Sequence, residues 1–224
     1  MARLMKKNVW KILSVVLLVY VIIAGFLGPI PDLDIVHQTI RNLYFHVCMW
    51  FVMITMLSIS VVNSIQYLAR FNLEKDTVAK EASLIGIFFG MMGIVTGMIW
   101  AQFAWGTWWI NDPKLNGAAV GLLVYFAYMV LRKSLDDPHK RARISAVYNI
   151  FAYVIFILFI LVLPKLSGVS LHPGDGKESI MPVMSMDNSL RIVFYPAILG
   201  WILLACWILN LRIRYIKVKN KIDT

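Results

Sequence analysis

The sequence predicts an all-α, polytopic membrane protein with six transmembrane helices. Three observations support this fold class. The 224 residues are 60% hydrophobic and only 15% charged, whereas a soluble domain carries about 25% charged residues. The mean hydropathy is +0.73, and several apolar runs reach the roughly 20 residues that a membrane-spanning helix needs. The chain therefore lacks the polar surface of a soluble protein.

Six spans are expected, because six segments are long and apolar enough to cross the hydrocarbon core. The first follows Lys6 and Lys7 as a signal peptide would. However, its apolar stretch exceeds the roughly 7–15 residues of such a signal, and no small-residue cleavage pattern follows. We therefore expect a retained helix, and a single six-helix domain over residues 1–224. The expected spans are Val9–Leu27, Leu43–Leu68, Ala82–Phe103, Gly117–Leu131, Ile144–Leu163 and Leu190–Leu211.

The basic residues predict the orientation of these spans. The formal net charge is +10, but the Lys and Arg residues form short clusters between apolar runs. That pattern is typical of membrane proteins and not of a nucleic-acid-binding surface. With a cytoplasmic N-terminus, 17 of the 22 basic residues fall in inner segments, so both termini are expected to be cytoplasmic. The outer segments hold Arg41, Lys114, Lys165, Lys177 and Arg191.

Glycine spacing predicts close packing of two helices. Small residues four apart let helix backbones approach closely in lipid. On this basis we expect the third and fourth helices to pack together and to hold the loop between them in place. The glycines concerned are Gly86, Gly90, Gly93 and Gly97 on the third span and Gly117 and Gly121 on the fourth.

The positions of the cysteines argue against a disulfide, and the absence of a phosphate-binding motif argues against ATP hydrolysis. Cys48 and Cys206 fall in spans near opposite faces of the bilayer, so no disulfide between them is expected. The sequence has no GxxxxGK[ST] loop, which excludes ATP hydrolysis by that route.

The loop between the third and fourth spans is rich in tryptophan. Residues 100–117 read WAQFAWGTWWINDPKLNG and include four of the eight tryptophans of the chain. The aromatic belts of membrane proteins spread their rings around the molecule, whereas this loop concentrates them. A flat ligand is therefore favoured over a belt, on the outer face that the orientation assigns to this loop.

Three of the four histidines fall on the same outer side. His37 lies in the first outer loop, His46 near the outer end of the second span and His172 in the third outer loop, whereas His139 lies in a cytoplasmic loop. Two outer histidines beside clustered indoles fit a haem, a flat and largely apolar macrocycle whose iron takes an axial imidazole on each side. The outer cations that could contact its propionates are Arg41, Lys114 and Arg191.

These segments resemble a known family. WGTWWINDPKL, residues 105–115, resembles the W-G-x-x-W-x-W-D signature of haem-handling proteins in cytochrome c biogenesis. NLYFHVCMW around His46 and LHPG around His172 resemble the histidine segments that flank this signature in the CcmC branch of the CcmC/CcmF/CcsA family. The resemblance extends over essentially the whole chain. Asn111 stands where the family usually has the last tryptophan before the aspartate, so the edge of the aromatic platform is expected to differ.

The resemblance implies a haem-delivery component rather than an enzyme. Such proteins hold haem b at the outer face of the bacterial cytoplasmic (inner) membrane and present it to a membrane-anchored haem chaperone. They work with an ABC transporter made of separate ATPase and membrane subunits, and with a small single-helix protein.

The resemblance also assigns the site residues by position. His46 and His172 are the expected axial ligands of the haem iron. The tryptophan-rich loop, residues 104–116, supplies the expected platform, with Trp100 placed inside the third helix and outside the platform. His172 lies on a loop with glycine and proline, so it is the ligand expected to leave when haem is released. The platform residues are Trp105, Trp108, Trp109 and Asp112.

Two other functions remain open from the sequence. A b-type cytochrome subunit that passes electrons from quinol generally holds haem between helices, and the middle of every expected span here lacks histidine. A ligand-free assembly subunit needs none of these residues. An absorption spectrum separates the three, because a ligand-free subunit has no Soret band and only a delivery protein gives its haem to a chaperone.

Overall fold

Six long helices make up the computed structural model of the chain, which describes residues 2–31, 37–168, 170–172 and 186–223, with the backbone alone for residues 2–7 and 37. Each of the six is long and apolar enough to cross a membrane, and no strand occurs within the described ranges. The all-α fold with six spans is confirmed. The elements are α1 (Ala2–Leu27), the 3₁₀ helix η1 (His37–Asn42), α2 (Leu43–Arg70), α3 (Leu73–Trp105), α4 (Pro113–Lys133), α5 (Pro138–Ile157), the π-helical η2 (Leu158–Val162), α6 (Leu163–Ser167) and α7 (Asn188–Ile222).

Most helices extend beyond the apolar stretches that predicted them, because polar residues at their ends are also helical. A side-chain oxygen accepts hydrogen bonds from first-turn N–H groups at the start of four helices. Prolines in the first turns of α4 and α5 fit there, since those positions have no intrahelical partner for an N–H group. The capping residues are Asn72, Asp112, Asp137 and Asp187.

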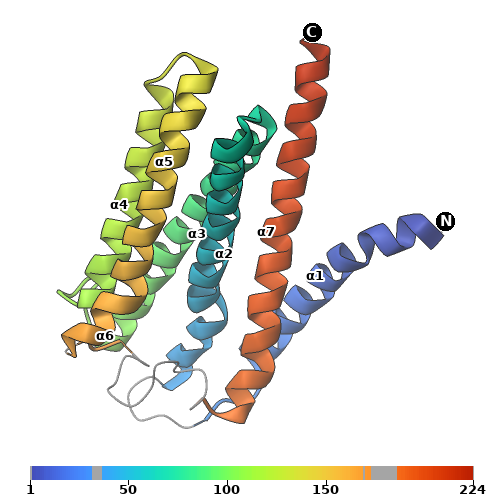
Figure 1. The fold of residues 1–224 in the computed structure, drawn as a ribbon. Coiled ribbons are helices and arrows are strands. Elements are labelled where there is room, and N and C mark those ends of the chain that lie inside the picture. Colours follow the sequence, from blue (N-terminus) through green and yellow to red (C-terminus); the bar gives the residue numbers. More distant parts are fainter. Residues whose placement is uncertain (1, 32–36, 169, 173–185, 224) are drawn as a thin grey trace.

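Helices α2 and α3 form the centre of the bundle, with α4 and α5 on one flank and α7 and α1 on the other (Figure 1). One apolar core joins α2 and α3 to α1 and α7, and a second joins them to α4 and α5. Cys48 lies in the first core and Cys206 packs against it; both are free, as predicted. Helix α1 diverges from the bundle toward its N-terminal end (Figure 1).

The two ends of the bundle carry different connections. Helix α7 ends at the end that also holds the α2–α3 and α4–α5 turns, whereas the N-terminal end of α1 lies to the side of the bundle, about midway along it (Figure 1). The opposite end holds η1, the α3–α4 loop and α6. The structure thus separates the tryptophan-rich loop from the C-terminal end of α7 by the length of the bundle.

The predicted pairing of the third and fourth helices through glycines is found at Gly90 alone among the predicted positions, where a Cβ atom would meet Leu122 of α4 as well as Met53 of α2. The glycines of α3 mainly face α2: a Cβ atom on Gly93 would meet Trp50, and one on Gly97 would meet His46. On α4, Gly117 and Gly121 face η2 and α5 instead. Small residues permit close approach to whichever helix lies across their face, and a short turn makes α2 the antiparallel neighbour of α3. The α3 glycines therefore leave room for the ring side chains of α2.

Ion pairs with buried carboxylates tie the helices together near the α2–α3 turn. The Arg132 guanidinium of α4 donates two hydrogen bonds of 2.7 Å to the Asp76 carboxylate of α3, and both side chains are buried. Glu81 of α3 is fully buried and accepts a 2.8 Å hydrogen bond from Arg212 of α7. Helix α3 is thus joined to both flanks by paired charges, as charges inside a membrane protein require.

Candidate functional site

His46 lies in the first turns of α2 and is buried against α3. Its Nδ1 lies 2.9 Å from the carbonyl oxygen of Gly93 and 3.2 Å from Thr96 Oγ1. A carbonyl oxygen only accepts, so Nδ1 carries the proton and Nε2 keeps its lone pair. Histidine ligands of metals are usually oriented in this way by a carbonyl on the other ring nitrogen. His46 is therefore prepared to bind a metal through Nε2.

His172 lies after α6 and comes next to His46 in space. The two ring centroids are 6.2 Å apart, with an angle of 49° between the ring planes. The His172 ring also lies 5.9 Å from the Trp100 ring and 6.0 Å from the Trp105 ring. The structure thus brings together both predicted histidine ligands and one predicted platform residue.

The surroundings of His172 favour a neutral imidazole. Burial lowers the pKa of His172 to about 3; the charge of Lys114 acts in the same direction, and Asp112 opposes it. Among the residues that the structure describes, the buried Nδ1 atom of His172 has no hydrogen-bond partner. A neutral imidazole is the form that donates a lone pair to a metal.

The tryptophans divide into two pairs. Trp100 and Trp105 are both in α3, with ring centroids 4.8 Å apart, and both pack against His172. Trp108 is 54% exposed, and Trp109 donates a 3.3 Å hydrogen bond to Asn116. In the described part of the chain, no ring contact joins either of these two residues to a histidine. The second pair thus forms the outward part of the loop.

The contact between Trp100 and His172 is a feature that the sequence interpretation missed. A periodic signal for it exists: Gly86, Gly90, Gly93, Gly97 and Trp100 recur at spacings of three and four, so they share one face of α3. That face packs on α2, which carries His46. The glycine stripe therefore directs Trp100 toward the histidines.

Asp112 caps α4 and also binds the segment that carries His172. Its Oδ1 accepts hydrogen bonds from the N–H groups of Lys114 (2.8 Å) and Leu115 (3.4 Å). Its Oδ2 accepts a 2.7 Å hydrogen bond from Leu171 N–H. Burial alone would raise the pKa of Asp112, but the hydrogen bonds to its carboxylate, led by that from Leu171, lower it below the usual value. One carboxylate thus both caps α4 and binds the segment that carries His172.

The three outer cations considered as propionate partners differ in position. Arg41 donates to the carbonyl oxygens of Gly25 (2.7 Å) and Gly28 (3.0 Å), so it closes the end of α1. Lys114 lies in the first turn of α4, near enough for its charge to act on His172. Arg191 lies in the first turns of α7. Among these three cations, Lys114 is therefore the one whose charge acts on His172.

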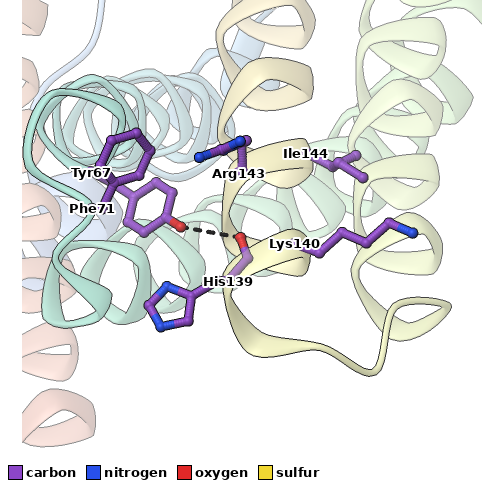
Figure 2. Close-up of a pocket in the computed structure, with 6 residues that line it drawn as sticks. All are labelled: Tyr67, Phe71, His139, Lys140, Arg143 and Ile144. Carbon is purple, nitrogen blue, oxygen red and sulfur yellow. Dashed lines mark hydrogen bonds between the residues drawn. The ribbon is translucent and has the colours of Figure 1, made fainter.

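His139 does not contribute to this arrangement. His139 is exposed at the opposite end of the bundle, where a cavity of about 490 Å³ lies between the end of α2 and the start of α5 (Figure 2). Tyr67 donates a 3.1 Å hydrogen bond there to the His139 carbonyl oxygen (Figure 2). The side chain of His37 lies outside the described part of the structure. The cavity is lined by Tyr67, Phe71, His139, Lys140, Arg143 and Ile144.

The fold and the site together define a class of protein: an integral membrane protein of six helices with two imidazoles and clustered indoles at one end. The chain belongs to the CcmC family, described as heme exporter protein C, which it matches over residues 1–224. Membership places it among the haem-handling membrane proteins of cytochrome c biogenesis.

Sequence identity to individual heme exporter proteins is moderate, and it extends over most of this chain. Heme exporter protein C of Paracoccus denitrificans is 28% identical over 176 residues, which are 79% of this chain and 72% of that protein. Heme exporter protein C of Rhodobacter capsulatus is 26% identical over 162 residues, or 72% of this chain and 65% of that protein. Cytochrome c biogenesis protein CcsA of Prochlorococcus marinus (strain MIT 9515) is 36% identical over 99 residues, 44% of this chain and 30% of that protein.

Proposed function

We propose that this protein holds haem b at the extracytoplasmic face of the bacterial inner membrane and presents it to a haem chaperone of cytochrome c maturation. It delivers haem as cargo and catalyses no reaction of its own. Its partners are the ATPase and membrane subunits of an ABC transporter and a small single-helix subunit. The paired imidazoles of His46 and His172, in a chain of the CcmC family, carry this proposal.

The spacing of the two imidazoles supports axial ligation of one iron. With metal–nitrogen bonds of about 2 Å on each side, two imidazoles that share an iron have ring centroids about 6 Å apart. The observed separation of 6.2 Å agrees with this value. His46 Nε2 has its lone pair available, because Nδ1 faces a carbonyl oxygen. The buried Nδ1 of His172, which has no hydrogen-bond partner among the described residues, is a further ligand atom of the kind that iron takes.

The donor set supports haem over a bare metal ion. Within the described ranges, no group of three or more His, Cys, Asp or Glu side chains is placed to hold a metal. Two imidazoles suffice for haem, whose porphyrin supplies the other four nitrogen ligands. Trp100 and Trp105 provide flat apolar walls beside His172, and we infer that Lys114 contacts a propionate. Trp108 and Trp109 extend the platform toward the outer edge, where a chaperone would approach.

Replacement of the ligands tests haem binding directly. His46→Ala and His172→Ala should each lower the haem retained by the purified protein and replace the spectrum of a bis-imidazole haem with that of a five-coordinate one. His139→Ala is the matched control, because His139 is exposed at the opposite end of the bundle. Equal loss of haem in all three variants would overturn the assignment. Full retention of haem in both His46→Ala and His172→Ala would also overturn it.

Delivery is tested separately with the chaperone. Wild-type protein purified with its membrane partners should transfer haem to added apo-chaperone, whereas either ligand variant should transfer little. A protein that binds haem through both histidines, passes electrons from quinol and transfers no haem would instead be a b-type cytochrome subunit. Wild-type protein without any Soret band would be an assembly subunit.

A further inference from the structure

The two carboxylate oxygens of Asp112 have different partners. Oδ1 faces the start of its own helix and accepts from Lys114 and Leu115. Oδ2 faces the segment after α6 and accepts from the backbone N–H of Leu171. Ser170 adds a bridge, because its hydroxyl donates to Oδ1 at 3.2 Å and accepts from His172 N–H at 3.2 Å. One carboxylate thus holds three consecutive residues that end at His172, the last of them through Ser170.

This arrangement exceeds what helix capping requires. Three other helices of the bundle also begin with a capping side chain, and within the described ranges each of these caps bonds the first turns of its own helix: Asn72 bonds Glu74, Asp137 bonds Lys140 and Asp187 bonds Ser189. Asp112 differs in that it also bonds a segment remote in sequence, and it is 2% exposed. A buried carboxylate needs several hydrogen bonds to remain charged, and half of those at Asp112 come from the His172 segment.

We propose that Asp112 is a positioning residue for His172: it fixes the backbone of residues 170–172 to the start of α4 and so holds the His172 imidazole opposite His46. The proposal deepens the proposed function, because it assigns the residue that keeps one ligand in place. It also connects the tryptophan-rich loop to that ligand, since Asp112 ends the loop. A partner that draws the loop away from the segment would release His172, while His46 stays fixed between α2 and α3.

Substitution by asparagine separates the two contacts. The new side chain of Asp112→Asn keeps one oxygen, which can cap α4 as asparagine commonly does. Its amide nitrogen would then face Leu171 N–H, and two donors cannot bond each other. The variant should therefore keep the cap and lose the contact with the His172 segment. Asp187→Asn is the matched control, because Asp187 caps α7 at the same end of the bundle and bonds Ser189 in the first turn of that helix.

Hydrogen exchange of the haem-free protein is the first test. In Asp112→Asn, the amide of Leu171 should exchange at least about tenfold faster, which corresponds to about 1.4 kcal/mol. The amides of Lys114 and Leu115 should keep their protection, and Asp187→Asn should leave all three unchanged. Unchanged exchange at Leu171 would overturn the proposal. Equal acceleration at Leu171, Lys114 and Leu115 would also overturn it, because Asp112 would then act only as a cap.

The haem spectrum is the second test and reports on the imidazole itself. Asp112→Asn should convert bis-imidazole haem to five-coordinate haem held by His46, and added free imidazole should restore the six-coordinate spectrum. Ser170→Ala should shift the spectrum in the same direction and by less. If Leu171 exchanges faster in Asp112→Asn but the haem spectrum remains that of a bis-imidazole haem, the positioning role is overturned. If the wild-type protein bound no haem, the proposed function would fail, and the exchange result alone would decide whether Asp112 positions the segment.

Discussion

At the scale of single residues, one backbone carbonyl determines which nitrogen of His46 can bind a metal. The Gly93 oxygen lies 2.9 Å from Nδ1, and the ring is packed in the α2–α3 interface. The imidazole therefore has one tautomer and little freedom to turn, which lowers the entropy lost when it binds a ligand. His172 has its ring packed against two tryptophans, and its backbone is held by Asp112 and Ser170. The two proposed ligands are thus held by different means: His46 by a helix interface, and His172 by a carboxylate.

The tryptophans should contribute unequally to haem binding. Trp105→Ala should weaken haem binding by about 1–3 kcal/mol, the range measured when an aromatic partner is removed from a stacked base, because its ring packs against His172. Trp108→Ala should cost less, since Trp108 is 54% exposed and contacts neither histidine ring in the described structure. Haem content per mole of protein, at equal protein abundance, measures both. A larger loss for Trp108 than for Trp105 would contradict the arrangement.

The sequence indicated the histidines and the tryptophan loop through local motifs, but it could not reveal how they meet. His46 and His172 come from distant parts of the chain, and their approach depends on the packing of α2, α3 and the α4 start. Trp100 was missed because it precedes the motif, although its place on the glycine face of α3 was visible in the spacing. The contact between Asp112 and Leu171 left no trace in the sequence, because the partner is a backbone N–H group that almost any residue could supply.

At the scale of helices, hydropathy identified each span but not its full length. Helix α3 begins at Leu73, well before the apolar run, because Asn72 caps a polar first turn that contains Glu74 and Asp76. The π-helical segment η2 had no sequence signal either; it lies where the backbone of Phe159 packs against Gly117. Apolar composition reports the part of a helix in contact with lipid, whereas caps and packing fix where it begins, ends or distorts.

Gly97→Ala should disturb the site through the helix interface. A Cβ atom there would lie 2.6 Å from Cε1 of His46, so the imidazole must move from its place beside Gly93. We expect a cost of about 1–3 kcal/mol, typical of overpacking, and weaker haem binding. Gly86→Ala is the control on the same face of α3, because its Cβ would meet the flexible end of Leu57 at 3.0 Å. Haem retention that is equal in the two variants would argue against this role of Gly97.

Asp76→Asn should destabilise the bundle without altering the haem site. It leaves the Arg132 guanidinium buried without its carboxylate partner, a change that typically costs about 3–5 kcal/mol. The exposed pair of Glu74 and Lys217, 3.5 Å apart, provides the control, since such surface pairs contribute about 0–1 kcal/mol. The thermal midpoint of the detergent-solubilised protein should fall clearly for Asp76→Asn and little for Glu74→Gln. Similar midpoints would mean that the buried pair adds nothing to stability.

At the scale of the whole molecule, the site depends on the complete bundle. Its residues come from the start of α2, the second half of α3, the α3–α4 loop and the segment after α6, and all of these lie at one end. The C-terminus and the α2–α3 turn lie at the other end (Figure 1). Asp76 and Glu81 form their ion pairs in the N-terminal part of α3, just after that turn. The molecule therefore has one end that is tied by ion pairs and one end that carries the proposed haem site, and its orientation in the membrane decides which compartment that site faces.

The orientation is tested by fusing a reporter that is active only outside the cytoplasm. Of the 22 basic residues, 17 lie in the two terminal segments and around the α2–α3 and α4–α5 connections. This charge bias predicts that these segments are cytoplasmic. A fusion after Lys177, which lies outside the described residues, should be active because it falls between α6 and α7. Fusions at the C-terminus and after Asp136, in the α4–α5 turn, should both be inactive. The reversed pattern would place His46 and His172 on the cytoplasmic side and exclude delivery to an outer chaperone. Activity at both Lys177 and the C-terminus would mean that α7 does not cross the membrane.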